Sequence, residues 1–172
     1  MNTLTRWLTH LWLDASDVRR ALPDAACARL EDAVRQSEAR HLGELRLCVE
    51  AGLDAARLWR SQTPRQRAIE LFSQLRVWDT AQNNGVLVYL LLAEHRIEIV
   101  ADRGLSERVA PQTWQHLADR LGEALAAGRT EAGLSQAIAE VGELLQRHFP
   151  DASEQGKRNG NRNELPDAIV LL

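Results

Sequence analysis

A continuous apolar run is the feature that most restricts how this chain can fold. It extends from Gly85 to Ala93 and contains valine, leucine and tyrosine between polar flanks. A run of this length and composition is typical of a strand that is buried on both faces of a sheet. It is much shorter than the roughly 20 residues that a membrane-spanning helix needs. We therefore predict a central strand with helices on both sides of its sheet.

Two segments with alternating apolar residues predict the neighbours of that strand. Residues 44–50 and residues 96–102 both alternate, which is typical of strands with one apolar face. The short turn Glu94-His95-Arg96 makes the second segment antiparallel to the central strand. The long connection from residue 51 to residue 84 contains a helical pattern, as expected for a parallel pair. The sheet is thus predicted to be small and mixed, with one βαβ crossover and one hairpin.

Helical spacing predicts the remaining elements of the domain. Thr63-Pro64-Arg65-Gln66 is a strong helix start, because threonine caps, proline fits the first turn and glutamine reaches back. Two helices close the domain, one beginning at Pro111 and one covering residues 131–148. The predicted fold class is α/β, a three-layer α/β/α sandwich. The predicted organisation is an N-terminal amphipathic helical segment (1–22), an α/β domain (23–150) and a disordered C-terminal tail (151–172).

The N-terminal segment carries a helical stripe of large apolar residues, namely Leu4, Trp7, Leu8, Leu11 and Trp12. Such a stripe could lie in a membrane interface, where tryptophan is favoured. The single formal cation of the polar face, Arg6, argues against that interpretation. We expect the stripe to pack on the core of its own domain.

The C-terminal tail changes in composition. Glycine, asparagine, serine, lysine and arginine dominate from Asp151 to Asn163, which predicts disorder. The apolar residues 168–172 could act as a docking peptide, but a floppy end is the expected state.

Composition and charge exclude several classes of function. The net charge is −3 and the pI is about 6.0, so the basic excess typical of nucleic-acid-binding proteins is missing. The two cysteines, Cys27 and Cys48, are better interpreted as small buried residues than as a disulfide or metal ligands. No secretory signal and no transmembrane segment is recognised, so a cytoplasmic location is expected.

A polar constellation is predicted where the strands end. The hairpin places the loop before the central strand beside the end of the third strand. That arrangement would bring together Trp78, Asp79, Asn83, Asn84, Asp102 and Arg103. Two carboxylates, two amides and a guanidinium could hold a hard cation or an anion. They could equally form a hydrogen-bonded loop corner, which is the interpretation we favour because Asn-Asn-Gly is good turn chemistry.

A second polar cluster, His41, Glu44 and Arg46, lies at the start of the first strand. A histidine and a glutamate can perform acid–base chemistry. Because no nucleophile is near in the sequence, we expect these residues to orient the loop. The other histidines, at positions 10, 95, 116 and 148, have no predicted role.

Two motifs resemble the TPM domain family. They are Asn83-Asn84-Gly85-Val86-Leu87 and the stretch Ile97 to Leu105, which ends in Asp102-Arg103-Gly104-Leu105. The family pattern is Asp-Asn-Gly-Val/Ala-Leu, a strand, and a second strand ending in Gly-x-Gly-Leu-Glu. The resemblance covers roughly residues 30–149 and implies an α/β/α sandwich. It also implies three known roles: calcium binding, acid phosphatase activity, and assembly or maintenance of membrane complexes. Bacterial relatives are often encoded beside LemA-type membrane proteins.

The chain departs from that pattern at its acidic positions. Asn83 stands where the family has aspartate, Ser106 where it has glutamate, and residues 109–112 carry no acid. Calcium needs about six oxygen ligands, and charge sets the affinity. The remaining candidates for Ca²⁺ or Mg²⁺ are Asp79 and Asp102, so no cofactor is expected.

Three functions remain open at this point. We expect first a non-enzymatic interaction or assembly module in the cytoplasm, peripheral to the inner membrane and linked to a LemA-type membrane protein. The second is a weak metal-dependent acid phosphatase or hydrolase that uses Asp79, Asn84, Asp102 and Arg103. The third is an anion-binding domain in which Arg103 holds the anion.

Overall fold

The computed structural model describes residues 3–151 and 163–172. Its centre is a sheet of four strands in the order β3-β2-β1-β4. β1 is parallel to both β2 and β4, and β2 is antiparallel to β3. The strands are β1 (Glu44–Glu50), β2 (Gly85–Leu91), β3 (Arg96–Ala101) and β4 (Val170–Leu171). The predicted crossover and hairpin are confirmed, and β4 is an addition that the sequence interpretation missed.

The apolar run forms the central strand, as predicted. Every residue of β2 is buried. Its first residue must be glycine, because a Cβ at Gly85 would overlap the backbone carbonyl of Val77. This close approach places the preceding loop against the start of the strand.

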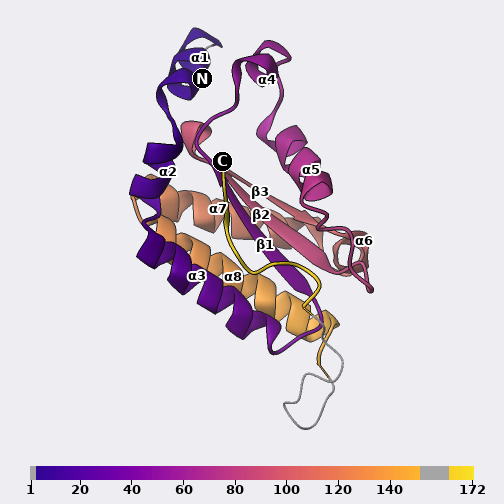
Figure 1. Ribbon diagram of the computed structural model, residues 1–172. Helices are drawn as coiled ribbons and strands as arrows, with labels where there is room; N and C mark the ends of the chain where they lie inside the picture. Colours follow the sequence, from indigo (N-terminus) through magenta and orange to yellow (C-terminus); the bar gives the residue numbers. More distant parts are fainter. Residues whose placement is uncertain (1–2, 152–162) are drawn as a thin grey trace.

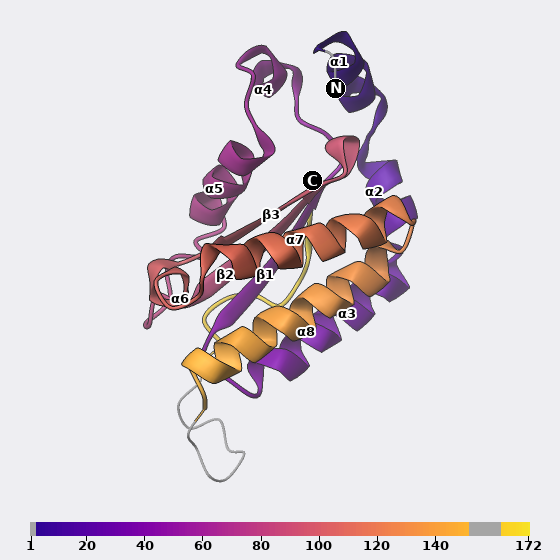
Figure 2. The same ribbon diagram turned by 180° about the vertical axis from the view of Figure 1, so that it is seen from behind.

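Helices cover both faces of the sheet (Figures 1 and 2). On one face lie α2 (Ala15–Ala21), α3 (Asp24–Glu38), α7 (Pro111–Ala126) and α8 (Thr130–His148). On the other lie α4 (Ala55–Trp59) and α5 (Pro64–Gln74). The short helix α6 (Arg103–Ser106) follows β3, and a 3-10 turn, η1 (Leu92–Glu94), joins β2 to β3. The three-layer α/β/α arrangement is therefore confirmed. None of the described helices is long and apolar enough to cross a membrane.

The alternation of β1 explains how one strand serves both layers. Leu45, Leu47 and Val49 pack in the core beneath α3 and α8. The opposite face is polar at the carboxyl end of β1. There the buried Glu50 accepts hydrogen bonds from Arg67 at 2.9 and 3.0 Å. The hydroxyl of Tyr89 donates to the same carboxylate at 2.6 Å. Pairing of this kind is what makes a buried charge tolerable.

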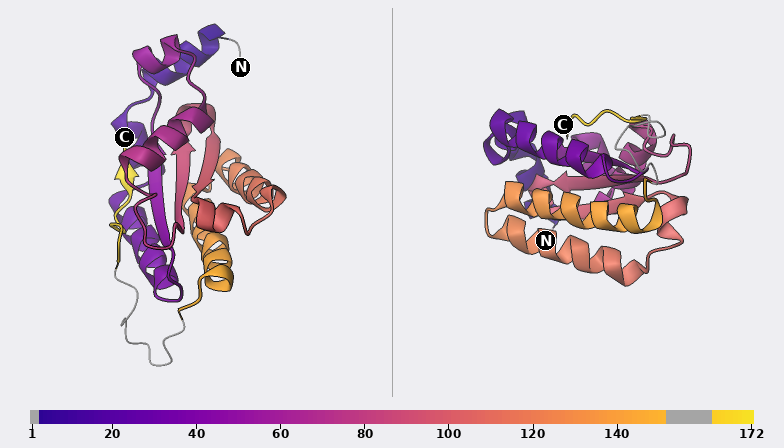
Figure 3. Two further views of the ribbon diagram at one scale, coloured as in Figure 1. Left: turned by 90° about the vertical axis from the view of Figure 1, so that its right-hand side faces the viewer. Right: turned by 90° about the horizontal axis from the view of Figure 1, so that it is seen from below.

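The C-terminal tail differs from the prediction of disorder. Residues 152–162 lie outside the described part of the chain. Residues 163–172, called here the C-terminal segment, run extended along the edge of β1 and end in β4 (Figure 3). The prediction of a floppy end is wrong for this segment, because the backbone edge of β1 and side chains of β1 and α3 supply hydrogen-bond partners that local composition does not reveal.

Candidate functional site

The hairpin brings part of the predicted constellation together. The carbonyl of Asn83 accepts a hydrogen bond from the Gly104 amide at 2.9 Å. Arg103 Nη2 donates to the side-chain oxygen of Asn83 at 3.3 Å. Asp102 N donates to the Gly85 carbonyl at 2.9 Å. The loop before β2 and the end of β3 thus form one corner, as the topology required.

Most polar groups of this corner are engaged in local contacts, but the buried atoms Asn84 Oδ1 and Asp102 Oδ2 have no hydrogen-bond partner among the described residues. The Asp102 carboxylate accepts from the amide of Arg103 at 2.7 Å and caps α6. The buried Asn84 side chain donates to the Leu42 carbonyl at 2.8 Å, which ties the corner to the start of β1. This arrangement is that of a hydrogen-bonded loop.

Asp79 and Trp78 lie apart from these contacts. Asp79 pairs with Arg76 at 3.2 Å, and both side chains are largely exposed. Trp78 is about half exposed to solvent. Among the described residues, no group of three or more histidine, cysteine, aspartate or glutamate side chains could hold a metal ion. The two carboxylates named as metal candidates have different partners. Asp79 pairs with Arg76, and Asp102 accepts from the Arg103 amide.

His41, from the second polar cluster, is a buried loop residue. Its Nδ1 lies 3.1 Å from the Gly43 carbonyl, and its Nε2 lies 3.1 Å from the Ser37 hydroxyl. Because a carbonyl only accepts, Nδ1 carries the proton and Nε2 accepts from Ser37. Burial lowers the pKa of His41 to about 4, so the ring is neutral near pH 7.

Glu44 and Arg46, the other members of that cluster, contact the C-terminal segment instead of His41. The Glu44 carboxylate accepts from the amides of Glu164 and Leu165 at 3.1 and 3.3 Å. Arg46 donates to the carbonyl of Pro166. Burial raises the pKa of Glu44 to about 7. The predicted cluster therefore divides into a loop-orienting histidine and a pair that holds the segment.

The N-terminal helix α1 (Thr3–Trp12) turns its polar side inward. His10 is buried, its Nδ1 accepts from the Leu53 amide at 2.8 Å, and its Nε2 lies 3.0 Å from the Glu94 carboxylate. Arg6 Nε donates to the same carboxylate at 2.9 Å, and its Nη2 donates to the Gln62 carbonyl at 2.6 Å. These contacts fix the helix on the loops beyond β1 and β2.

The apolar side of α1 consequently faces solvent. Trp12 is 83% exposed, Leu4 68%, Leu11 61% and Leu8 51%. Trp59 of the neighbouring α4 is 82% exposed. Only Trp7 of the stripe packs against a core cluster. The prediction that the stripe packs on its own core is wrong for the other four residues, because the contacts of Arg6 and His10 set the rotation of the helix.

The two helices that carry these side chains lie at one end of the molecule. Figure 1 shows α1 and α4 side by side beyond the carboxyl ends of the parallel strands β1 and β2. We call Leu4, Leu8, Leu11, Trp12 and Trp59 the α1 surface. The spacing of the stripe was visible in the sequence, whereas its orientation depended on Glu94 and Leu53, which are remote in sequence.

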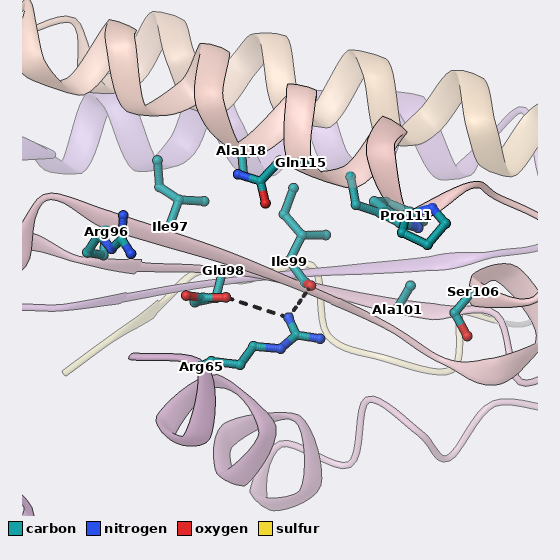
Figure 4. Close-up of a pocket in the computed structure, with 11 residues that line it drawn as sticks. Arg65, Arg96, Ile97, Glu98, Ile99, Ala101, Ser106, Pro111, Gln115 and Ala118 are labelled. Carbon is teal, nitrogen blue, oxygen red and sulfur yellow. Dashed lines mark hydrogen bonds and ion pairs between the residues drawn. The ribbon is translucent and has the colours of Figure 1, made fainter. Parts of the chain in front are cut away.

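A groove of about 380 Å³ follows the free edge of β3, between α5 and α7 (Figure 4). Arg65 reaches across from α5 and donates to the Ile99 carbonyl at 2.6 Å, with Glu98 at 3.7 Å. Sequence reasoning did not identify this groove, because its walls come from four separate elements, α5, β3, α6 and α7.

Solved structures of two bacterial proteins share this fold. The first is the NMR structure of the BA42 protein from Bizionia argentinensis, with a TM-score of 0.70 and 25% identity, covering 88% of this chain and 95% of that one. The second is the N-terminal domain of a protein from P. gingivalis, with a TM-score of 0.57 and 22% identity, covering 76% of this chain and 82% of that one. Their likeness supports the architecture described above.

The sequence comparisons agree with the structural ones. No curated protein matches this chain. The TPM domain matches residues 16–144, which reach from α2 into α8 and include the strands β1 to β3. The matched region contains the Asn83–Leu87 motif and the hairpin that follows it. This chain belongs to the TPM domain family.

Proposed function

We propose that the protein is a non-enzymatic interaction module that docks on a membrane surface through the α1 surface. The observation that carries the proposal is the rotation of α1, which places Arg6 and His10 inside and four large apolar side chains outside. Amphipathic helices of folded domains bury their apolar side. Within the described part of the chain, the reversed arrangement leaves Leu8, Leu11 and Trp12 largely exposed, and an external partner is proposed to cover them.

The composition of this face favours an interfacial partner. Burying a leucine side chain gains about 1.5 to 3 kcal/mol, and tryptophan suits the boundary between water and hydrocarbon. Contiguous exposed apolar patches mark interaction sites on folded proteins. The two most exposed of these side chains are Trp12 and Trp59, which come from two different helices. Both helices lie at the same end of the molecule.

The charge of α1 indicates whether docking depends on anionic lipids. The Arg6 guanidinium is already paired with Glu94, so α1 offers little attraction to anionic lipid. Docking should therefore depend on apolar contact and respond weakly to salt. The proposed site of action is the cytoplasmic side of the inner membrane, where a LemA-type protein is the partner that the family resemblance suggests.

Cosedimentation of the full chain with lipid vesicles tests the proposal. We expect retention by phosphatidylcholine vesicles, with little gain when phosphatidylglycerol is added. The double variant Leu8→Ser/Trp12→Ser should lose about tenfold in vesicle affinity, and Trp59→Ser somewhat less. Trp78→Ser is the matched control, because Trp78 is also exposed but lies outside the α1 surface.

Thermal melting of each variant shows whether the fold is intact, which is expected since the substituted side chains are exposed. If the wild-type chain is not retained by either kind of vesicle, docking on lipid is excluded. Equal retention of wild type and the double variant would show that another surface is used.

A further inference from the structure

The C-terminal segment (residues 163–172) is held largely through its backbone. Glu44 accepts hydrogen bonds from the amides of Glu164 and Leu165. Glu31 accepts from the Ile169 amide at 3.0 Å. The last residue, Leu172, donates to the Val49 carbonyl and accepts from the Ala51 amide, both at 2.9 Å. Recognition of main-chain groups at a sheet edge is the mode by which many domains bind extended peptides.

The groups that hold the segment belong to the main body of the domain. Glu44 and Arg46 project from β1, and Glu31 and Arg35 project from α3. Glu44 is buried, and it directs its carboxylate at two amides of the segment. Arg35 pairs with Asp167 at 3.3 Å. The edge of β1 and the neighbouring α3 therefore supply both acceptors and donors for an extended chain.

Side chains of the segment add selectivity. Leu165 is buried in the cluster that contains Leu87 and Tyr89. Ile169 and Val170 pack against opposite core clusters, as the alternation of a strand requires. Leu171 and Leu172 remain 37% and 42% exposed. The contacts thus favour the pattern Leu-Pro-Asp-x-Ile-Val, with a buried leucine at its start.

We propose that the edge of β1 is a peptide-binding site that the chain's own C-terminal segment occupies as a resident ligand. The external ligand is an extended peptide of a partner protein with the same pattern, a leucine before proline and an acidic residue, then two β-branched residues. This site is separate from the α1 surface and does not depend on it.

The link to the domain makes exchange with such a peptide feasible. Residues 152–162 have the sequence Ala-Ser-Glu-Gln-Gly-Lys-Arg-Asn-Gly-Asn-Arg, which contains no large apolar residue. Covalent tethering through a peptide link of this length gives an effective concentration on the order of millimolar. An external peptide must compete with that concentration. The resident segment therefore lowers the apparent affinity of the site for an external peptide but does not prevent its binding.

A labelled peptide of residues 163–172 tests the site on the full chain. In the variant Leu165→Asp/Val170→Asp, the resident segment is weakened while β1 and α3 are unchanged. We expect this variant to bind the peptide saturably and at least about tenfold more tightly than wild type does. Adding Glu31→Ala or Glu44→Ala to that variant should weaken binding again, because each substitution removes an acceptor from the site.

A scrambled peptide of the same composition is the control. Binding of the scrambled peptide with equal affinity would overturn the proposal, as would a folded Leu165→Asp/Val170→Asp variant that binds no peptide. If that variant fails to fold, hydrogen exchange of the wild-type chain shows whether the C-terminal segment leaves the β1 edge without global unfolding. The amides of Ala51 and Leu172 should exchange at least about tenfold faster than those joining β1 to β2. Exchange of both sets only on global unfolding would show that the segment does not leave.

Discussion

The two edges of the sheet present the same kind of backbone groups but are protected in different ways. At the β1 edge, the C-terminal segment lies alongside the strand, and its residues Val170 and Leu171 pair with it as β4. At the β3 edge, the Arg65 side chain reaches the Ile99 carbonyl and a groove stays open beside it. An exposed edge is a template for pairing with another chain, so both solutions limit unwanted association.

The comparison shows what each solution costs. Next to the C-terminal segment, Glu38 of α3 and Glu44 of β1 are buried, and burial raises the pKa of both carboxyl groups. The β3 edge requires no buried charge, because Arg65 stays half exposed. The stability of the β1 edge, which a strand covers, is thus linked to proton binding by Glu38 and Glu44. The β3 edge, which the Arg65 side chain covers in part, has no such link.

The largest expected effect on the free energy of unfolding is at Leu165, which holds the C-terminal segment against the β1 edge. Leu165→Ala removes a buried side chain that joins the segment to the core, and the free energy of unfolding should fall by about 2 to 3 kcal/mol. Denaturant unfolding measures the loss. Leu172→Ala, at a position 42% exposed, should cost less than about 1 kcal/mol. Similar small values for both variants would show that the segment adds little to the stability of this edge.

The next effect is a pH dependence that belongs to the β1 edge. Burial raises the pKa of Glu38 to about 8 and that of Glu44 to about 7, from ordinary values near 4.5. The folded chain therefore holds these protons at pH values where the unfolded chain has released them. The free energy of unfolding should fall as pH rises toward 8. Glu38→Gln should flatten this dependence in melting curves.

His41 contributes with the opposite sign, in a lower range. Its pKa is lowered to about 4 from 6.5 by burial, so its contribution to stability is lost as pH falls from 6.5 to 4. The unfolded-state histidines, which include His10 with its lowered pKa, still release protons up to about pH 7.5. Above about pH 7.5 the histidine contribution is nearly constant, so the change in the free energy of unfolding there reports on the carboxyl groups. A stability that rises with pH in this range would contradict the expected protonation of Glu38 and Glu44.

The smallest effect on stability is expected at the open edge. Arg65→Ala removes a half-exposed contact, so the free energy of unfolding should change by less than about 1 kcal/mol. The Ile99 carbonyl would then be free to pair with another chain, and self-association should rise with concentration. Analytical ultracentrifugation measures this, with Arg96→Ala as the control. Unchanged association would mean that Arg65 does not protect the edge.

The regular elements were predictable because each rests on local rules. The Thr63-Pro64-Arg65-Gln66 start became a helix whose Thr63 side chain and Gln66 form a capping box. The run from Gly85 became the buried central strand. The turn at His95 produced the hairpin that brought Asn83, Asp102 and Arg103 together. Neighbouring residues are sufficient to specify these features.

The candidate surfaces were less predictable because each depends on partners distant in sequence. The stripe of α1 was recognised, but its outward rotation follows from Glu94, more than eighty positions away from Arg6 and His10. The roles of Glu44 and Arg46 follow from a segment about 120 positions away. In both cases composition gave the residue types but not the side of the molecule that they face.

By itself, the sequence determined three of the four strands, the hairpin and crossover that join them, the long helices and the family. These depend on apolar periodicity and turn chemistry, which act over a few residues. Only the tertiary structure decided which face of α1 is exposed and whether the C terminus is ordered. Both outcomes depend on hydrogen bonds between distant elements, whose strength comes from burial that the complete fold creates.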